Sequence, residues 1–292
     1  MERSGINMFR IIALAVLAAI FAPHALADEI VLRADAPIVE VTVNGKPARM
    51  LVDPFLPDLM VFNPDTQARL GVRPVPMLNA RAVFDDTSIR ARLARPKLVF
   101  ANGKSSRAFA GLFGERWSER PDVDGAMGPG VLPYDRVRVV LREGAGGTVQ
   151  TWRLVKREIW AIIQPVAGAN AQVGFSLSRA QTVLNRPLAR AMDEARLLSL
   201  TGEVQQQRFF LGLTTTVQMA HTDARVAGRP MGVTIARTDA PLAGAADVDV
   251  ITVTASAGEP QRKTVTLGMN ALAGCYEFVW ERAAGTLSLR CD

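Results

Sequence analysis

Residues 37–63 constrain the fold of this chain more than any other stretch. Apolar and polar residues alternate through residues 38–43, which is the pattern of a half-buried strand. Asn44-Gly45 follows, and an Asn-Gly pair between two apolar runs is typical of a tight β-hairpin. A second apolar run, residues 48–52, leads directly into Asp53. The sequence therefore predicts a hairpin that holds one carboxylate at the end of a buried strand.

A similar order of features returns in the second half of the chain. Residues 173–185 echo residues 52–63: each stretch ends in an apolar pair and an Asn, and a helix containing a Pro follows. Farther on, Leu267-Gly268-Met269 mirrors Met127-Gly128-Pro129 ahead of a closing strand. Repetition in the same order indicates an internal repeat of domain size.

This layout resembles the two-lobed plan of pepsin-like aspartic proteases, built from retropepsin-like units, over about residues 36–290. The resemblance implies a mostly-β, two-lobed, aspartic-protease-like β-barrel fold with short helices. It places an N-terminal lobe at residues 28–157 and a C-terminal lobe at residues 158–292. A hairpin at residues 97–109 is either the flap that covers the cleft in such proteases or an ordinary surface hairpin.

The catalytic residues of that family are only partly present. Its members use two carboxylates that share one proton, one from an Asp-Thr-Gly motif in each lobe. Asp53 matches the first acid, but Pro54 and Phe55 follow it. Residues 173–182 contain no acid, so Phe175, Ser176 or Ser178 occupies the second place, depending on the alignment. These substitutions predict a degenerate catalytic Asp53, and they make Pro54, Phe55, Phe175, Ser176 and Ser178 candidate binding residues.

Three roles remain open for Asp53. It is a relic acid satisfied at the lobe interface, a polar contact in a binding cleft, or a catalytic acid with an unexpected partner such as Asp58 or a second copy of the chain. We expect a pseudoprotease that binds extended polypeptide between the lobes. The alternatives are an active aspartic-type endopeptidase, a hydrolase using Asp53 with an atypical second acid, and a structural domain whose cleft is filled.

The sequence lacks the residue patterns that several other kinds of catalytic or binding site require. After residue 27 the chain has one histidine, His221, and it lies away from any nucleophile motif, which disfavours Ser-His-Asp and Cys-His hydrolases. A zinc site needs several Cys or His ligands, so we expect no metal. No glycine-rich nucleotide motif is present, so we expect no cofactor. The formal charge of +6 comes without a basic block interleaved with aromatics, so we expect no nucleic-acid partner.

The N-terminus predicts export. Arg3 and Arg10 flank a short apolar run, and Ala25-Leu26-Ala27 offers a small-residue cleavage site. Residues 1–27 therefore read as a signal peptide cleaved after Ala27, with translation starting at Met1 or Met8. The run is short for a bilayer, so we expect no membrane span and a periplasmic or secreted protein.

Two cysteines close the chain. If a hairpin is centred on residue 283, Cys275 and Cys291 fall opposite each other. An oxidising compartment would let them form a disulfide; the alternative is a pair of buried thiols.

Overall fold

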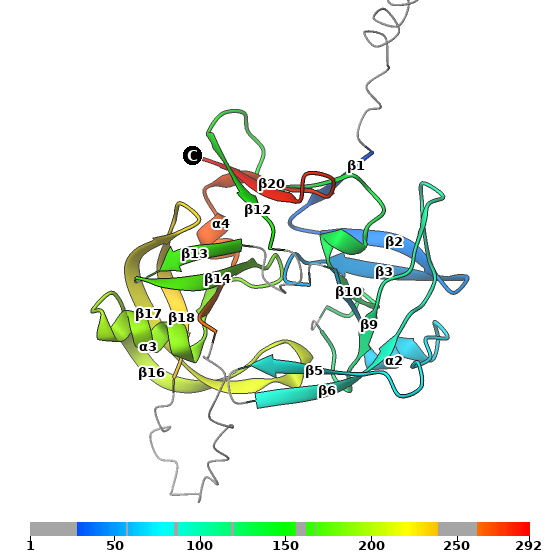
Figure 1. The fold of residues 1–292 in the computed structure, drawn as a ribbon, viewed down its shortest axis with the longest axis horizontal. Helices are drawn as coiled ribbons and strands as arrows, with labels where there is room; N and C mark the ends of the chain where they lie inside the picture. The colour runs from blue at the N-terminus through cyan, green and yellow to red at the C-terminus, as the bar shows by residue number, and fades with distance from the viewer. Residues whose placement is uncertain are drawn as a thin grey trace, which may run out of the picture.

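The computed structural model describes residues 28–56, 58–84, 87–117, 120–155, 162–166, 168–238 and 262–292. Strands dominate these ranges, as the sequence predicts, and they form three sheets (Figure 1). The expected signal peptide lies outside the described residues. No helix in these ranges is long and apolar enough to cross a bilayer.

The first half of the chain builds a nine-stranded sheet around the expected hairpin. Asn44 and Gly45 both have positive φ at its turn, which Asn and Gly adopt more readily than other residues. The strands of this sheet are β2 (Ile38–Val43), β3 (Lys46–Val52), β4 (Met60–Phe62), β5 (Asn79–Phe84), β6 (Thr87–Ala94), β7 (Leu98–Phe100), β8 (Ser105–Ser106), β9 (Ala110–Leu112) and β10 (Gly125–Met127).

The second half builds a seven-stranded sheet. Its strands are β13 (Ile162–Val166), β14 (Ala169–Phe175), β15 (Thr182–Leu184), β16 (Ser199–Arg208), β17 (Thr214–Val226), β18 (Arg229–Arg237) and β19 (Thr264–Leu267). The helices of the described ranges are short: α2 (Pro64–Gln67), η1 (Pro129–Val131), α3 (Arg186–Glu194), η2 (Phe210–Gly212) and α4 (Met269–Leu272).

The two larger sheets repeat one topology. The order β5-β6-β9-β4-β10-β3-β2 in the first corresponds to β16-β17-β18-β15-β19-β14-β13 in the second. The pairs β4·β9 and β3·β10 are parallel, as are their counterparts β15·β18 and β14·β19. The other neighbours in both series are antiparallel. Matching order and direction are the structural form of an internal duplication.

A third sheet joins the halves. Its strands are β1 (Glu29–Arg33), β11 (Arg136–Val140), β20 (Cys275–Glu281), β21 (Thr286–Cys291) and β12 (Thr148–Arg153), in that order. The central pair, β11 with β20, couples the end of one repeat to the end of the other. Phe62, Phe175 and Phe278, one from each sheet, are fully buried in a single core cluster.

One expectation needs correction. The sheets are open within the described residues, because β5 does not pair with β8 and β13 does not pair with β16. The barrel part of the fold prediction is therefore not met. The sequence also predicted no element for β5 (Asn79–Phe84) and β6 (Thr87–Ala94), which pair as antiparallel strands. The β7–β8 hairpin, where a flap was considered, pairs along β2 and extends the edge of its sheet.

Candidate functional site

Asp53 and Ser176 occupy equivalent positions in the two repeats. Asp53 directly follows β3, and its backbone N–H donates to Met127 O on β10 over 2.9 Å. Ser176 directly follows β14, and its N–H donates to Leu267 O on β19 over 3.0 Å. Ser176 is thus the topological counterpart of Asp53 in the second half.

The two positions meet in space. Asp53 is fully buried, and its Oδ2 accepts from Ser176 Oγ over 2.9 Å and from Ser178 Oγ over 2.5 Å. Its Oδ1 accepts from the backbone N–H of Phe55 over 3.0 Å. A buried carboxylate is tolerated only when such donors replace its lost water. The contact therefore joins the halves through one acid and two hydroxyl groups.

No second carboxyl group contacts Asp53 among the described residues. Asp58, the partner considered from the sequence, is exposed and makes no contact with Asp53 there. The same ranges hold no cluster of three or more His, Cys, Asp or Glu side chains that could bind a metal ion.

Arg179 directly follows Ser178 in the chain and lies beside this contact. Its guanidinium carbon is 4.7 Å from the ring centre of Phe209 and 5.9 Å from that of Phe55. Burial of the guanidinium group lowers the pKa of Arg179 to about 10, although the nearby Asp53 acts in the opposite direction. Both aromatic contacts are favourable cation–π geometry. Arg179 thus bridges an aromatic ring from each half directly beside Asp53.

The tip of the β16–β17 hairpin crosses to the first half. Leu211 is 3% exposed and packs in a separate core cluster with Phe55 and Trp117. Its N–H donates to Arg116 O over 3.1 Å, and Arg208 pairs with Glu115 over 2.8 Å. This tip, residues 208–213, therefore covers one approach to the Asp53 contact.

The remaining candidate residues have different surroundings. Pro54 and Phe55 are buried, and the Phe55 ring lies 5.8 Å from that of Trp117. Phe175 is fully buried and packs edge-on against Phe278 at 5.7 Å, in the main core rather than at the Asp53 contact. Ser178 is exposed, whereas Ser176 is buried beside Asp53.

The sequence did not single out Arg179, Phe209, Leu211 or Trp117. Arg179 had one available signal, its position directly after Ser178. Phe209 and Leu211 lie in one hairpin tip, Trp117 lies in a loop far from them in the chain, and only the crossing of the hairpin brings them together.

A cavity of about 780 Å³ lies in the first half. It is bounded by β5, β6, α2 and the chain after β9. Its lining residues are Pro64, Gln67, Asn79, Ala80, Arg90, Ala91, Arg92, Leu112, Phe113 and Gly114. None of them is a predicted site residue, so this cavity does not include Asp53.

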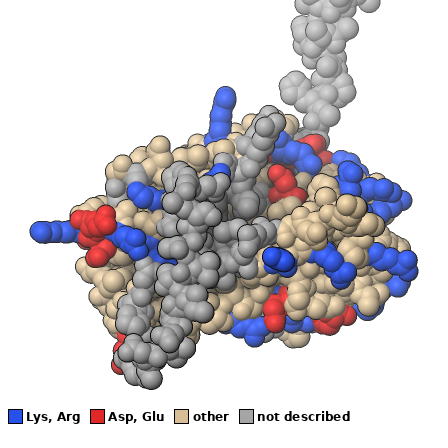
Figure 2. Space-filling model, turned by 60° about the horizontal axis from the view of Figure 1, so that its bottom comes forward, with Lys and Arg blue, Asp and Glu red and all other residues tan. Residues whose placement is uncertain are grey.

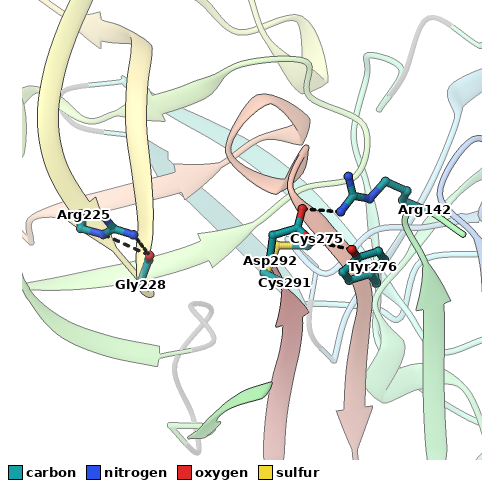
Figure 3. Close-up of a disulfide and its surroundings, with 7 residues drawn as sticks. All are labelled: Arg142, Arg225, Gly228, Cys275, Tyr276, Cys291 and Asp292. Atoms are coloured by element: carbon teal, nitrogen blue, oxygen red, sulfur yellow. Dashed lines mark hydrogen bonds and ion pairs between the residues drawn. A yellow bond between two sulfur atoms is a disulfide. The ribbon is translucent and has the colours of Figure 1, made fainter. Parts of the chain in front are cut away.

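The predicted disulfide is confirmed: Cys275 and Cys291 are bonded across β20 and β21 (Figure 3). The register of the outer hairpin pairs Glu281 with Thr286, which alone would leave Cys275 opposite Asp292. A bulge at Tyr276 shifts the register so that Cys275 faces Cys291. Beside the bond, Asp292 accepts from the Tyr276 hydroxyl and pairs with Arg142, each over 2.5 Å.

Figure 2 shows Lys and Arg spread over one face of the molecule, with Asp and Glu among them.

No known protein family and no curated protein matches the chain in sequence.

Proposed function

We propose that this chain is an exported, catalytically inactive relative of two-lobed retropepsin- and pepsin-like proteases that binds extended polypeptide. The observation that carries the proposal is the contact of Asp53 with Ser176, its topological counterpart. The matching strand orders of the two larger sheets support the two-lobed architecture. The disulfide supports export, since such bonds persist in oxidising compartments such as the periplasm.

The chemistry of the contact argues against peptide hydrolysis. In an acid dyad, one carboxylate activates water while the other protonates the scissile group. A serine hydroxyl cannot replace the second carboxylate. Its pKa is too high for it to act as the acid, and it cannot share one proton with Asp53 as a second carboxylate would. Here both hydroxyls are committed to Asp53 Oδ2. Asp53 consequently serves as the hydrogen-bond acceptor that joins the two halves.

The sheet edges support binding of an extended chain. β5 and β16 are terminal strands of the two larger sheets, so their outer edges carry backbone groups without a strand partner among the described residues. Most of β16 is exposed. An extended peptide can add to such an edge through main-chain hydrogen bonds, and pockets for alternate side chains supply preference.

The test combines binding and cleavage. The purified protein and its Asp53→Asn variant are incubated with a fluorescently labelled unfolded polypeptide at pH 4 and pH 7.5. Anisotropy measures binding, and mass spectrometry detects cleavage. We expect saturable binding without cleavage, unchanged by a pepstatin-type inhibitor. Cleavage that disappears in the variant would instead identify an active endopeptidase, and circular dichroism checks that the variant is folded.

A further inference from the structure

Two positively charged side chains line the cavity in the first half. Arg90 and Arg92 line it from β6, and Asn79 lines it from β5. Arg90 and Arg92 are two residues apart, so they lie on the same face of the strand. Asn79 is the cross-strand partner of Arg92 in the hairpin register. Three polar groups thus share one wall of a space of about 780 Å³.

Among the described residues, no acid pairs with either arginine. Both arginines are exposed, and neither forms an ion pair within that part of the chain. Asp65, next to Pro64 on α2, already pairs with Arg116 over 2.6 Å. Strands β5 and β6 contain no acidic residue. Arg90 and Arg92 therefore bring two cationic groups to the lining of the cavity.

The rest of the lining is apolar or already hydrogen-bonded. Leu112, Phe113 and Pro64 contribute hydrophobic surface, and Leu112 is the cross-strand neighbour of Arg92. The Gln67 side-chain amide donates to the carbonyl groups of Phe62 and Phe113, over 3.2 Å each, so it is already committed. A ligand that fits this lining has an aliphatic stem and a terminal anion.

We propose that this cavity accepts acidic side chains of a bound extended polypeptide, with Arg90 and Arg92 as the pairing residues. Guanidinium groups bind carboxylates through paired hydrogen bonds, and the stem of a glutamate matches the apolar part of the lining. The position supports this occupant, because Asn79 and Ala80 on the edge strand β5 also line the cavity. This inference rests on the proposed polypeptide binding and adds to it a preference for acidic sequences.

Two labelled ten-residue peptides test the preference: one alternates Thr with Glu, and its counterpart alternates Thr with Gln. Anisotropy titrations use the full protein, the double variant Arg90→Gln/Arg92→Gln, and a control, Arg73→Gln/Arg107→Gln. The control residues are also exposed and do not line the cavity, so both variants lose the same charge.

We expect the unmodified protein to bind the Glu peptide about tenfold more tightly than the Gln peptide, with the difference shrinking at high salt. The cavity variant should lose this difference, and the control should retain it within about twofold. Equal affinity of the unmodified protein for the two peptides, or equal loss in both variants, would overturn the inference and leave polypeptide binding intact. Failure to bind either peptide would refute the proposed function itself.

Discussion

At the scale of single residues, the site depends on one acid and two hydroxyl groups. Ser176 holds the same place in its repeat as Asp53 holds in the other, and it donates to that acid. Ser178 supplies a second hydroxyl to the same oxygen atom. Two equivalent positions thereby form a donor–acceptor contact across the halves.

Placing a second acid at position 176 should destabilise the protein at neutral pH. In Ser176→Asp, two carboxylates share a buried site, so one of them has a raised pKa in the folded state. Its contribution to stability is present below the unfolded pKa and is lost as the pH rises through the folded value. We expect an unfolding free energy lower by about 2–4 kcal/mol at pH 7, with a smaller deficit at pH 4.

Urea unfolding at both pH values measures this effect. Ser176→Asn, which adds similar volume without charge, is the control, and its deficit should not depend on pH. An equal deficit at both pH values in Ser176→Asp would contradict the assignment of Ser176 to the acid position.

The two tyrosines should both ionise above their usual range. The hydrogen bond to Asp292 raises the pKa of Tyr276, and burial raises the pKa of Tyr134. Since the chain has only these two tyrosines, absorbance at 295 nm should show little phenolate at pH 10. Asp292→Asn should bring the pKa of Tyr276 back toward its usual value. The control, Asp35→Asn at an exposed site, should change the pKa of neither tyrosine.

At the scale of elements, the hairpin β16–β17 has the most consequence, because its tip reaches the other half. Leu211 anchors the tip although its backbone has φ of +57°, a conformation that costs a non-glycine residue about 1 kcal/mol. The buried contacts with Phe55 and Trp117 offset that cost. The corresponding hairpin of the first half, β5–β6, borders the cavity instead.

Truncating Leu211 should loosen the tip. Leu211→Ala removes the buried side chain and should cost about 2–4 kcal/mol, with a red shift of Trp117 emission as water reaches the indole. Leu211→Gly removes more side chain but relieves the backbone, so it should be no less stable than the alanine variant. Thermal unfolding and tryptophan fluorescence measure both effects, and a glycine variant clearly less stable than the alanine variant would contradict this account of the tip.

At the scale of the whole molecule, the third sheet fixes the two repeats to each other. β20 and β21 come from the end of the chain, yet they pair with β11 and β12 from its first half. The disulfide closes the hairpin that supplies these two strands. Loosening this hairpin therefore weakens the junction of the halves as well as the C-terminus.

Reduction should accordingly lower global stability. The bonded cysteines are 16 residues apart, and closing such a loop contributes about 3 kcal/mol in the chain-entropy estimate. Thermal unfolding with a reducing agent should show that loss. Cys275→Ser/Cys291→Ser should show the same loss without reductant and no further change with it. Unchanged stability on complete reduction, verified by thiol titration, would contradict the role of the bond.

Local patterns in the sequence determined the Asn44-Gly45 hairpin, the position of Asp53 at the end of a strand, and the pairing of the cysteines. Each depends on residues close together in the chain, where turn chemistry and alternation act directly. The β5–β6 hairpin was not predicted, although Arg90 and Arg92 alternate with Ile89, Ala91 and Leu93 as in a half-buried strand. Only the tertiary structure decided that Ser176 faces Asp53, that Leu211 packs beside Trp117, and that Arg90 and Arg92 border a cavity. Those contacts join segments far apart in the chain, and their geometry follows from how the sheets pack rather than from local propensity.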